Sequence, residues 1–329
     1  MIEVKHLTKR YGGHIAVSDL SFTIEKGVVY GFLGPNGAGK STTMNIIAGC
    51  LGATDGTVSI DGHDIGEDPM KAKRLIGYLP EQPPLYMDMT PAEYLGFVAA
   101  AKGIPHSQRD EQLRNVMRRT GIELMQKRLI RNLSKGYKQR VGIAQALLGD
   151  PEVIILDEPT VGLDPAQIIE IRELIRELGQ KHTIVLSSHI LSEVQTVCDS
   201  IMIISKGKLV ASDTAENLTA LFKGQENVRL ESRADKATIS EILEGINGIK
   251  DFRFSSGETD CLAAEIVPVD GRDLREAIFR AFAASDVPLL ELHCERASLE
   301  DVFLELTQED TNENTRNGSQ IEHEEASGQ

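Results

Sequence analysis

A glycine-rich run lies directly after an apolar segment and directly before a segment with helical periodicity. It fits the pattern G-x-x-x-x-G-K-[ST] and consists of Gly34, Pro35, Asn36, Gly37, Ala38, Gly39, Lys40, Ser41 and Thr42. Glycines allow backbone N–H groups to curl around phosphates, and the start of a helix adds unpaired N–H donors and a positive dipole end. The run predicts a phosphate-binding loop, in which Lys40 reaches the β- and γ-phosphates of a nucleotide and the Ser41 hydroxyl binds Mg²⁺.

Two adjacent carboxylates follow a second apolar run. Asp157 and Glu158 come after residues 153–156, so they are predicted at the carboxyl end of a buried strand, where open α/β sheets bind ligands. By itself such a strand end is most often only structural. Beside a phosphate-binding loop, Asp157 is suited to Mg²⁺, and Glu158 is suited to act as general base toward water attacking the γ-phosphate.

Short runs of β-branched and aliphatic residues predict the strands that position these groups. The runs are residues 28–33, 75–79, 153–156, 183–186 and 201–204. Between them, apolar side chains recur at helical spacing, for example at Tyr137, Val141, Ala144 and Leu148. Continuous apolar strands that alternate with helices indicate an α/β fold with a mostly parallel sheet covered on both faces.

The chain is too long for one average domain, and a break in its periodicity near residues 222–226 indicates where two domains meet. We expect the α/β domain over residues 1–222 and a small α+β domain over residues 226–308. The predicted element order of the second domain is βαββαβ, which is the ferredoxin-like pattern, and an amphipathic helix follows at 299–306. Residues 309–329 are acidic and poor in apolar side chains, so we expect a disordered tail.

Composition argues against several classes of protein. The net charge of −15 disfavours nucleic acid as a partner. Four single cysteines argue against a disulfide framework and a zinc site, and we expect them to be small core residues: Cys50, Cys198, Cys261 and Cys294. No apolar run approaches the roughly 18 to 20 residues that cross a bilayer, and the first residues do not form a secretory signal. We therefore expect the chain in the cytosol, where any membrane role requires a partner.

A third motif carries a family resemblance. Residues 133–137, Leu-Ser-Lys-Gly-Tyr, lie shortly before the predicted strand at 153–156 and resemble the signature motif of ATP-binding cassette (ABC) ATPases. Four further residues stand where this family has functional ones, in the family's order: Tyr11, Gln82, Asp164 and His189. Each alone has an ordinary structural explanation. Their joint occurrence over residues 1 to about 220 is very hard to attribute to chance.

The resemblance implies a role for each of these four residues. Tyr11 would stack on adenine, and Gln82 of the Q-loop would contact the nucleotide and Mg²⁺. Asp164 of the D-loop would couple two ATP sites, and His189 would steady the γ-phosphate.

The signature itself departs from the family's commonest form, L-S-G-G-Q. Lys135 replaces the first glycine and Tyr137 replaces the glutamine, whereas Ser134 and Gly136 are present. Ser134 can cap the following helix and donate to a γ-phosphate, and Gly136 allows close approach of the backbone. The resemblance implies that all four face the ATP of a second subunit, and the two departures bear on turnover more than on ATP binding.

The family implies a P-loop ABC ATPase domain with a helical subdomain, and an ATPase that uses ATP and Mg²⁺ to power transport. Two cassettes would pair head to tail, as a homodimer, with two ATP molecules in the interface. Membrane-spanning permease subunits would dock at the Q-loop and an apolar groove within residues 90–130, which places the chain at the cytoplasmic face of the cell membrane. One cassette with a small second domain resembles the multidrug-export (ABC-2-type) or gliding-motility group, and so indicates export.

Two alternatives remain open at this point. A non-transport ABC ATPase acting on ribosomes or DNA is disfavoured, because the chain has one cassette and no long heptad insertion between Lys40 and Ser134. A nucleotide-gated scaffold with little hydrolysis is motivated by Lys135 and Tyr137. The resemblance implies that the membrane subunits select the transported substrate.

Overall fold

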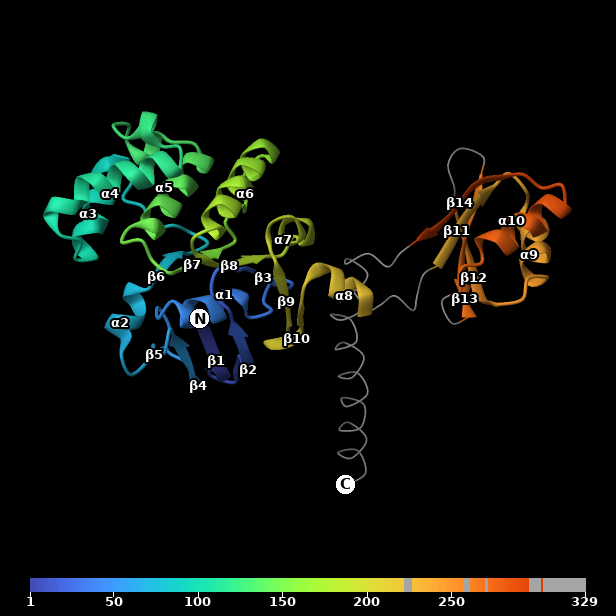
Figure 1. The fold of residues 1–329 in the computed structure, drawn as a ribbon, viewed down its shortest axis with the longest axis horizontal. Coiled ribbons are helices and arrows are strands. Elements are labelled where there is room, and N and C mark those ends of the chain that lie inside the picture. Colours follow the sequence, from blue (N-terminus) through green and yellow to red (C-terminus); the bar gives the residue numbers. More distant parts are fainter. Residues whose placement is uncertain (222–226, 257–260, 270–271, 296–302, 304–329) are drawn as a thin grey trace, which may run out of the picture. The chain divides into compact units, whose positions relative to one another are not determined.

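The structure is a computed structural model that describes residues 1–221, 227–256, 261–269, 272–295 and 303 (Figure 1). The chain forms two compact units, Met1–Ala215 and a second unit that begins at Glu216. The predicted boundary at 222–226 and the predicted tail at 309–329 lie outside the described residues, and so does the helix predicted at 299–306 except for Phe303. The division of the chain at 222, 226 and 308 therefore stays a prediction.

A six-stranded sheet in the order β10-β9-β3-β8-β7-β6 is the centre of the first unit. Its strands are β3 (Val29–Leu33), β6 (Ile76–Leu79), β7 (Val153–Asp157), β8 (Thr183–Ser188), β9 (Ser200–Ser205) and β10 (Lys208–Asp213). All neighbours are parallel except β9 and β10, which are antiparallel. The predicted strands and the α/β class are confirmed. The carboxyl ends of β3, β7 and β8 share one edge, where the predicted site residues follow the strands.

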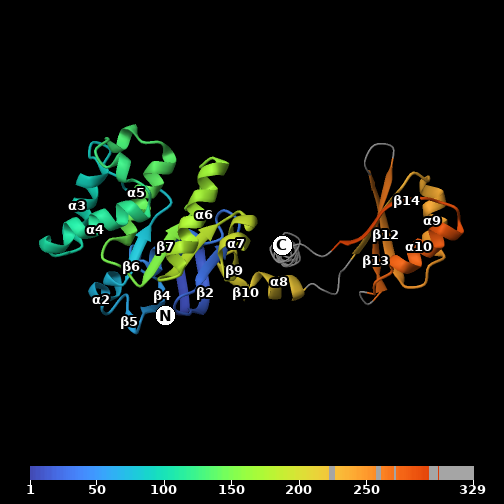
Figure 2. The ribbon, with the colours of Figure 1, turned by 45° about the horizontal axis from the view of Figure 1, so that its top comes forward.

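Apolar side chains bury both faces of this sheet. On one face, Met44 and Ile47 of α1 (Lys40–Ile47) belong to a buried cluster with Phe32 and Ile155 of the strands. The alternate strand residues, such as Ile154, are fully buried as well. α6 (Pro165–Gly179) contacts β8, and α7 (Leu191–Val197) contacts β3 and β8 (Figure 2). The helices therefore enclose the strands and hold the carboxyl ends at fixed positions.

An antiparallel sheet in the order β2-β1-β4-β5 packs on the cluster of α1, a feature the sequence did not predict. Its strands are β1 (Ile2–Tyr11), β2 (His14–Ile24), β4 (Asp55–Ile60) and β5 (His63–Asp64), and α2 (Pro69–Arg74) follows. The pairing of β1 with β2 shifts register three times, so apolar side chains do not alternate regularly along β1. The turn between β1 and β2 carries Tyr11 and His14 to the phosphate-binding loop.

A helical subdomain follows β6 and confirms the expectation for residues 90–130. It contains α3 (Pro91–Ala101), α4 (His106–Arg119), two short 3₁₀ helices (Glu123–Met125 and Ile130–Asn132) and α5 (Lys135–Leu147). α3 begins with a capping box, in which Glu93 N–H donates to Thr90 Oγ1 and Thr90 N–H donates to Glu93 Oε2. Lys102 Nζ donates to Leu148 O at 2.7 Å, directly after α5, so the end of α3 is tied to the signature helix.

The second unit contains a four-stranded antiparallel sheet and two helices that pack on one face of it. The sheet and its helices are β11 (Asn227–Ser232), α9 (Lys236–Glu244), β12 (Ile249–Ser256), β13 (Leu262–Pro268), α10 (Arg275–Ala284) and β14 (Leu289–Glu295). They follow α8 (Ala215–Leu221), which begins at the last residue of the first unit. The strand order is β12-β13-β11-β14. Phe282 and Ile278 of α10, Ile239 and Leu243 of α9, and Leu230 of β11 are all fully buried. This unit thus has its own apolar core.

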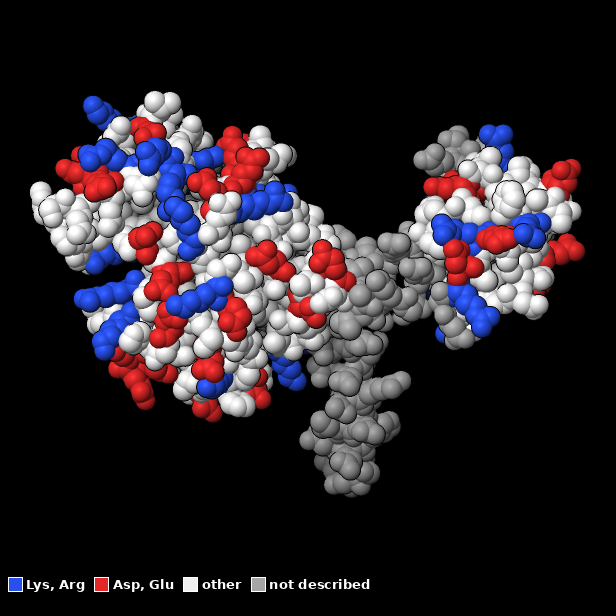
Figure 3. Space-filling model, viewed as in Figure 1, with Lys and Arg blue, Asp and Glu red and all other residues white. Residues whose placement is uncertain are grey.

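Three further features concern the expectations drawn from composition. Within the described ranges, no helix has the length and apolarity needed to span a membrane. Cys50 is exposed and Cys198, Cys261 and Cys294 are only partly buried, so the prediction that the cysteines are core residues is wrong for Cys50. On the face drawn in Figure 3, positive and negative side chains are interspersed over both units.

Candidate nucleotide-binding site

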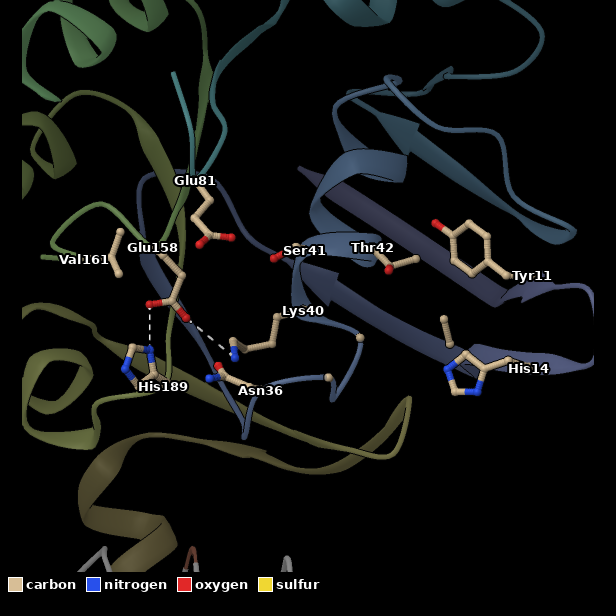
Figure 4. Close-up of a pocket in the computed structure, with 13 residues that line it drawn as sticks. Tyr11, His14, Asn36, Lys40, Ser41, Thr42, Glu81, Glu158, Val161 and His189 are labelled. Carbon is tan, nitrogen blue, oxygen red and sulfur yellow. Dashed lines mark hydrogen bonds and ion pairs between the residues drawn. The ribbon is translucent and has the colours of Figure 1, made fainter. Parts of the chain in front are cut away.

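A cavity of about 510 Å³ opens at the carboxyl ends of β3, β7 and β8 (Figure 4). It is lined by Tyr11, His14, Ala16, Asn36, Gly37, Gly39, Lys40, Ser41, Thr42, Glu81, Glu158, Val161 and His189. Most of these residues come from the phosphate-binding loop and from the segments directly after β7 and β8. The cavity therefore joins residues that are up to 178 positions apart in the chain, from Tyr11 to His189.

The phosphate-binding loop has a backbone that only glycine adopts without strain at several positions. Gly37 and Gly39 have φ of 82° and 101°, and Gly39 is the N-cap of α1. A Cβ at Gly34 would lie 2.3 Å from the carbonyl oxygen of Ile204, so any larger residue would displace the loop. The loop thus presents its amide groups and the first turn of α1 to the cavity.

Lys40 is held under this loop and is 5% exposed. Its ammonium donates hydrogen bonds to Gly34 O at 2.8 Å and Pro35 O at 3.2 Å. It also lies 3.6 Å from Glu158 Oε1. The ammonium can exchange these partners for phosphate oxygens, because it borders the cavity.

Asp157 forms a cluster of oxygen atoms with two hydroxyls. Ser187 Oγ donates to Asp157 Oδ1 at 2.6 Å, and Ser41 Oγ donates to the same atom at 3.1 Å. Burial raises the pKa of the Asp157 carboxyl above its ordinary value, and the negative charge of Glu158 raises it further. The hydrogen bonds from the two serine hydroxyls lower this pKa and so reduce the shift. A carboxylate and a hydroxyl at this spacing are the hard oxygen donors that Mg²⁺ prefers.

Glu158 and His189 form the second half of the site. His189 Nδ1 lies 2.9 Å from Glu158 Oε2, and Figure 4 shows this contact on the side of the cavity opposite Tyr11. Glu158 is 6% exposed and has φ of 49°, a left-handed conformation that is strained for a residue other than glycine. The hydrogen bond from its N–H to Ser187 Oγ at 2.9 Å holds that conformation. Glu158 therefore has one oxygen toward His189 and the other toward Lys40.

Tyr11 lies at the far rim of the cavity from Glu158. Its ring is half exposed, and Lys9 Nζ lies 5.3 Å from the ring centre. An exposed ring at a cavity rim is suited to stacking on a base. Four more residues line the cavity that sequence reasoning did not assign to the site, because no motif singles them out: His14, Ala16, Glu81 and Val161.

Other predicted site residues lie outside the cavity lining. Gln82 is exposed and its neighbour Glu81 faces the cavity instead. Gly34, Pro35 and Ala38 belong to the loop but do not line the cavity, and Asp157 is also outside the lining.

The signature residues and Asp164 gather at the starts of two neighbouring helices. Ser134 is the N-cap of α5, where its Oγ accepts from Tyr137 N, and Asp164 is the N-cap of α6. A Cβ at Gly136 would lie 2.5 Å from Gln167 Oε1 in the first turn of α6. A Cβ at Gly162 would lie 2.1 Å from Lys135 Nζ, so the lysine side chain covers the D-loop of its own chain. The signature and the D-loop thus form one surface, separate from the cavity lining.

The strand, glycine loop and helix with Lys40 and Ser41, and the two carboxylates after β7, define a P-loop nucleotide-binding protein. The model of the ABC transporter family matches residues 17–161. The uncharacterized ABC transporter ATP-binding protein YhcH of Bacillus subtilis is 35% identical over 315 residues, which are 94% of this chain and 96% of the relative. The chain belongs to the ATP-binding subunits of ABC transporters.

Two further comparisons agree with this family. The bacitracin transport ATP-binding protein BcrA of Bacillus licheniformis is 33% identical over 93% of this chain and 97% of its own length. The dimeric ATP-binding cassette MJ0796, in a post-hydrolysis state with ADP and Pi, superposes with a TM-score of 0.60 and 26% identity. That match covers 65% of this chain and 98% of that chain. As a member of the family, the chain is an ATPase whose hydrolysis serves transport.

Proposed function

We propose that this chain is the ATP-hydrolysing subunit of an exporter and works as a homodimer on permease subunits at the cytoplasmic face of the cell membrane. The observation that carries the proposal is the cavity in which Lys40, Glu158 and His189 converge on the space next to the phosphate-binding loop. Asp157 lies directly behind the cavity-lining Ser41, whose hydroxyl donates to it. Export is supported by the similarity to BcrA over nearly the whole chain, since that protein is named for bacitracin transport.

In this proposal, ATP lies with its base on Tyr11 and its phosphates on residues 34–42. Lys40 leaves Gly34 O and Pro35 O for the β- and γ-phosphates. Glu158 accepts a proton from the attacking water, and His189 steadies the γ-phosphate while it fixes the orientation of the Glu158 carboxylate. The left-handed backbone of Glu158 is consistent with this role, because strain of this kind is found at functional positions.

Ser41 and Asp157 are the residues that would hold Mg²⁺. The Ser41 Oγ and the Asp157 Oδ1 lie 3.1 Å apart, so a hydroxyl and a carboxylate oxygen are held side by side as hard donors. The ion would neutralise charge on the β- and γ-phosphates. Sequence reasoning also assigned Gln82 to Mg²⁺, but Gln82 is exposed, whereas Asp157 is hydrogen-bonded to the cavity-lining Ser41, so we place only Ser41 and Asp157 at the metal.

A second copy of the chain completes each site in this proposal. Ser134, Lys135, Gly136 and Tyr137 lie at the start of α5, where the helix dipole places partial positive charge. The dimeric state of the MJ0796 cassette supports a head-to-tail pair. Asp164, which caps the adjacent helix α6, would couple the two sites.

An aromatic cluster supports docking of a permease helix on the helical subdomain. Tyr86 and Phe97 are each about half exposed, and their ring centres are 5.3 Å apart. Tyr86 also packs at 5.8 Å on Tyr94, which is buried at the base of the cluster. Exposed aromatic residues at a helix surface are suited to receive an amphipathic helix.

Affinity purification of the full chain from detergent-solubilised membranes, followed by mass spectrometry, tests the proposal. We expect a multi-span membrane protein to co-purify. Phe97→Glu is a matched variant, because it places a charge in the aromatic cluster and leaves the cavity unchanged, so it should release the membrane protein while ATP binding persists. Recovery of ribosomal or nucleic-acid proteins only would favour the non-transport alternative. Equal phosphate release by wild type and Glu158→Gln would favour the scaffold alternative.

A further inference from the structure

A buried carboxylate lies behind the pair formed by Glu158 and His189. Glu193 is in the first turn of α7 and is 5% exposed. Its Oε2 accepts a hydrogen bond from Thr160 Oγ1 at 2.6 Å and another from Ser188 Oγ at 2.9 Å. Glu193 is absent from the cavity lining, so any effect on hydrolysis has to act through other residues.

The two hydroxyls belong to the loops that carry the catalytic pair. Thr160 comes two residues after Glu158, and Ser188 comes directly before His189. Ser188 Oγ also accepts from the N–H of Ile190 at 3.0 Å, so its hydroxyl holds both sides of His189. One carboxylate oxygen therefore fixes the spacing between the loop after β7 and the loop after β8.

The other oxygen of Glu193 connects these loops to α6. Oε1 lies 3.7 Å from a terminal nitrogen of Arg172, which is in the second turn of that helix. Asp164 of the D-loop caps the same helix. A displacement of the D-loop can thus reach the catalytic pair through Arg172 and Glu193.

This arrangement is a poor way to gain stability alone. Burying a carboxylate has a large desolvation cost. For Glu193 this cost is offset only by hydrogen bonds from two hydroxyls and by a single contact with the Arg172 guanidinium. Among the described residues, Arg172 Nε is buried without a hydrogen-bond partner. Apolar residues of similar volume would cost less at this position, which favours a role other than stability.

We propose that Glu193 is a positioning residue for ATP hydrolysis, an inference that rests on the proposed function. It keeps the Glu158 carboxylate and the His189 imidazole at their contact distance of 2.9 Å, and so keeps the carboxylate aimed at the attacking water. It also makes that geometry depend on the position of the D-loop.

Steady-state phosphate release by the full-length Glu193→Gln variant tests the inference. The amide keeps the shape but loses the charge, and it has only one acceptor oxygen. If this oxygen accepts from the two hydroxyls, the NH₂ group faces the Arg172 guanidinium; if it faces Arg172, the NH₂ group faces the two hydroxyls. We expect kcat to fall about 10- to 100-fold while KM for ATP changes less than about twofold. Thr160→Val should act in the same direction, and Thr160→Ser should keep the wild-type rate because it retains the hydroxyl. Glu231→Gln is the matched control, since Glu231 is buried to a similar extent in the second unit.

A double-mutant cycle separates positioning from a structural role. If Glu193 acts through Glu158, then Glu193→Gln causes little further loss in the Glu158→Gln background. Wild-type kcat in Glu193→Gln, or an equal loss in both backgrounds, would overturn the inference. Parallel losses of ATP binding and thermal stability with unchanged kcat per folded molecule would also overturn it. Absence of hydrolysis by the wild type would instead contradict the proposed function.

Discussion

Glu158→Gln changes one charge at the centre of the site and leaves its shape intact. In the structure, Glu158 Oε1 lies 3.6 Å from Lys40 Nζ, and Oε2 lies 2.9 Å from His189 Nδ1. The contact with Lys40 matters for ATP binding, because Lys40 has to exchange the Glu158 carboxylate for phosphate oxygens. The variant removes this competition and also removes a negative charge that repels the γ-phosphate.

The distance sets the scale of the effect on ATP binding. Two unit charges 3.6 Å apart attract by about 5 kcal/mol at an effective dielectric constant near 20. Most of this gross energy is offset by the desolvation of Glu158 in the folded chain. We expect the remainder to strengthen ATP binding on the order of tenfold, or about 1.4 kcal/mol. Hydrolysis should fall about 10²- to 10⁴-fold, because the general base is lost.

Calorimetric ATP titration and phosphate release measure the two effects on the same sample. Glu152→Gln is the matched control. Glu152 is an exposed carboxylate that directly precedes β7 and pairs with Lys26, whereas Glu158 directly follows β7. The control should bind and hydrolyse ATP like the wild type. The reasoning is refuted if Glu158→Gln binds ATP more weakly than the wild type, or if it retains more than about a tenth of the wild-type rate.

Three other predictions concern separate parts of the chain. Lys26 and the N-terminal amine lower the pKa of Asp61 to about 2, so its contribution to stability is present above about pH 4 and is lost toward pH 2. Asp61→Asn should therefore lower Tm at pH 7, and a difference that stayed constant down to pH 2 would contradict this. Tyr11→Ala should weaken ATP binding by about 1–3 kcal/mol in a calorimetric titration, whereas Tyr11→Phe should not. Phe282→Ala should destabilise the second unit by about 3–5 kcal/mol in urea unfolding, because its side chain is fully buried there. ATP binding should persist in that variant, and its loss would show that the two cores unfold together.

The parallel sheet could be predicted because its signals are local in the sequence. β7 and β8 are continuous apolar runs, and the phosphate-binding loop has a fixed spacing between a strand and a helix. The antiparallel sheet was missed because β1 shifts register between Val4 and Leu7 and again near Lys9, which breaks the alternation that marks such strands. A local pattern therefore identified one sheet and not the other.

The residues of the candidate site likewise divide into those that local motifs predict and those that only the fold brings together. Lys40, Ser41 and Glu158 follow from motifs, and the structure brings them to one cavity. Glu193 could not be found from sequence, since only the packing of α7 brings its carboxylate to Thr160, 33 positions away. The contact of Lys135 with Gly162 is likewise tertiary, because two helix starts have to meet before the lysine can cover the D-loop.

The molar mass of Glu158→Gln in solution, measured by light scattering during size exclusion, tests the central claim most directly. If ATP is bound between two chains, the variant has the mass of one chain without nucleotide and of two chains with saturating Mg-ATP. Ser134→Arg in the same background should stay at the mass of one chain, because its side chain occupies the surface that meets the partner's ATP. A mass of one chain for Glu158→Gln with ATP demonstrably bound would contradict the account.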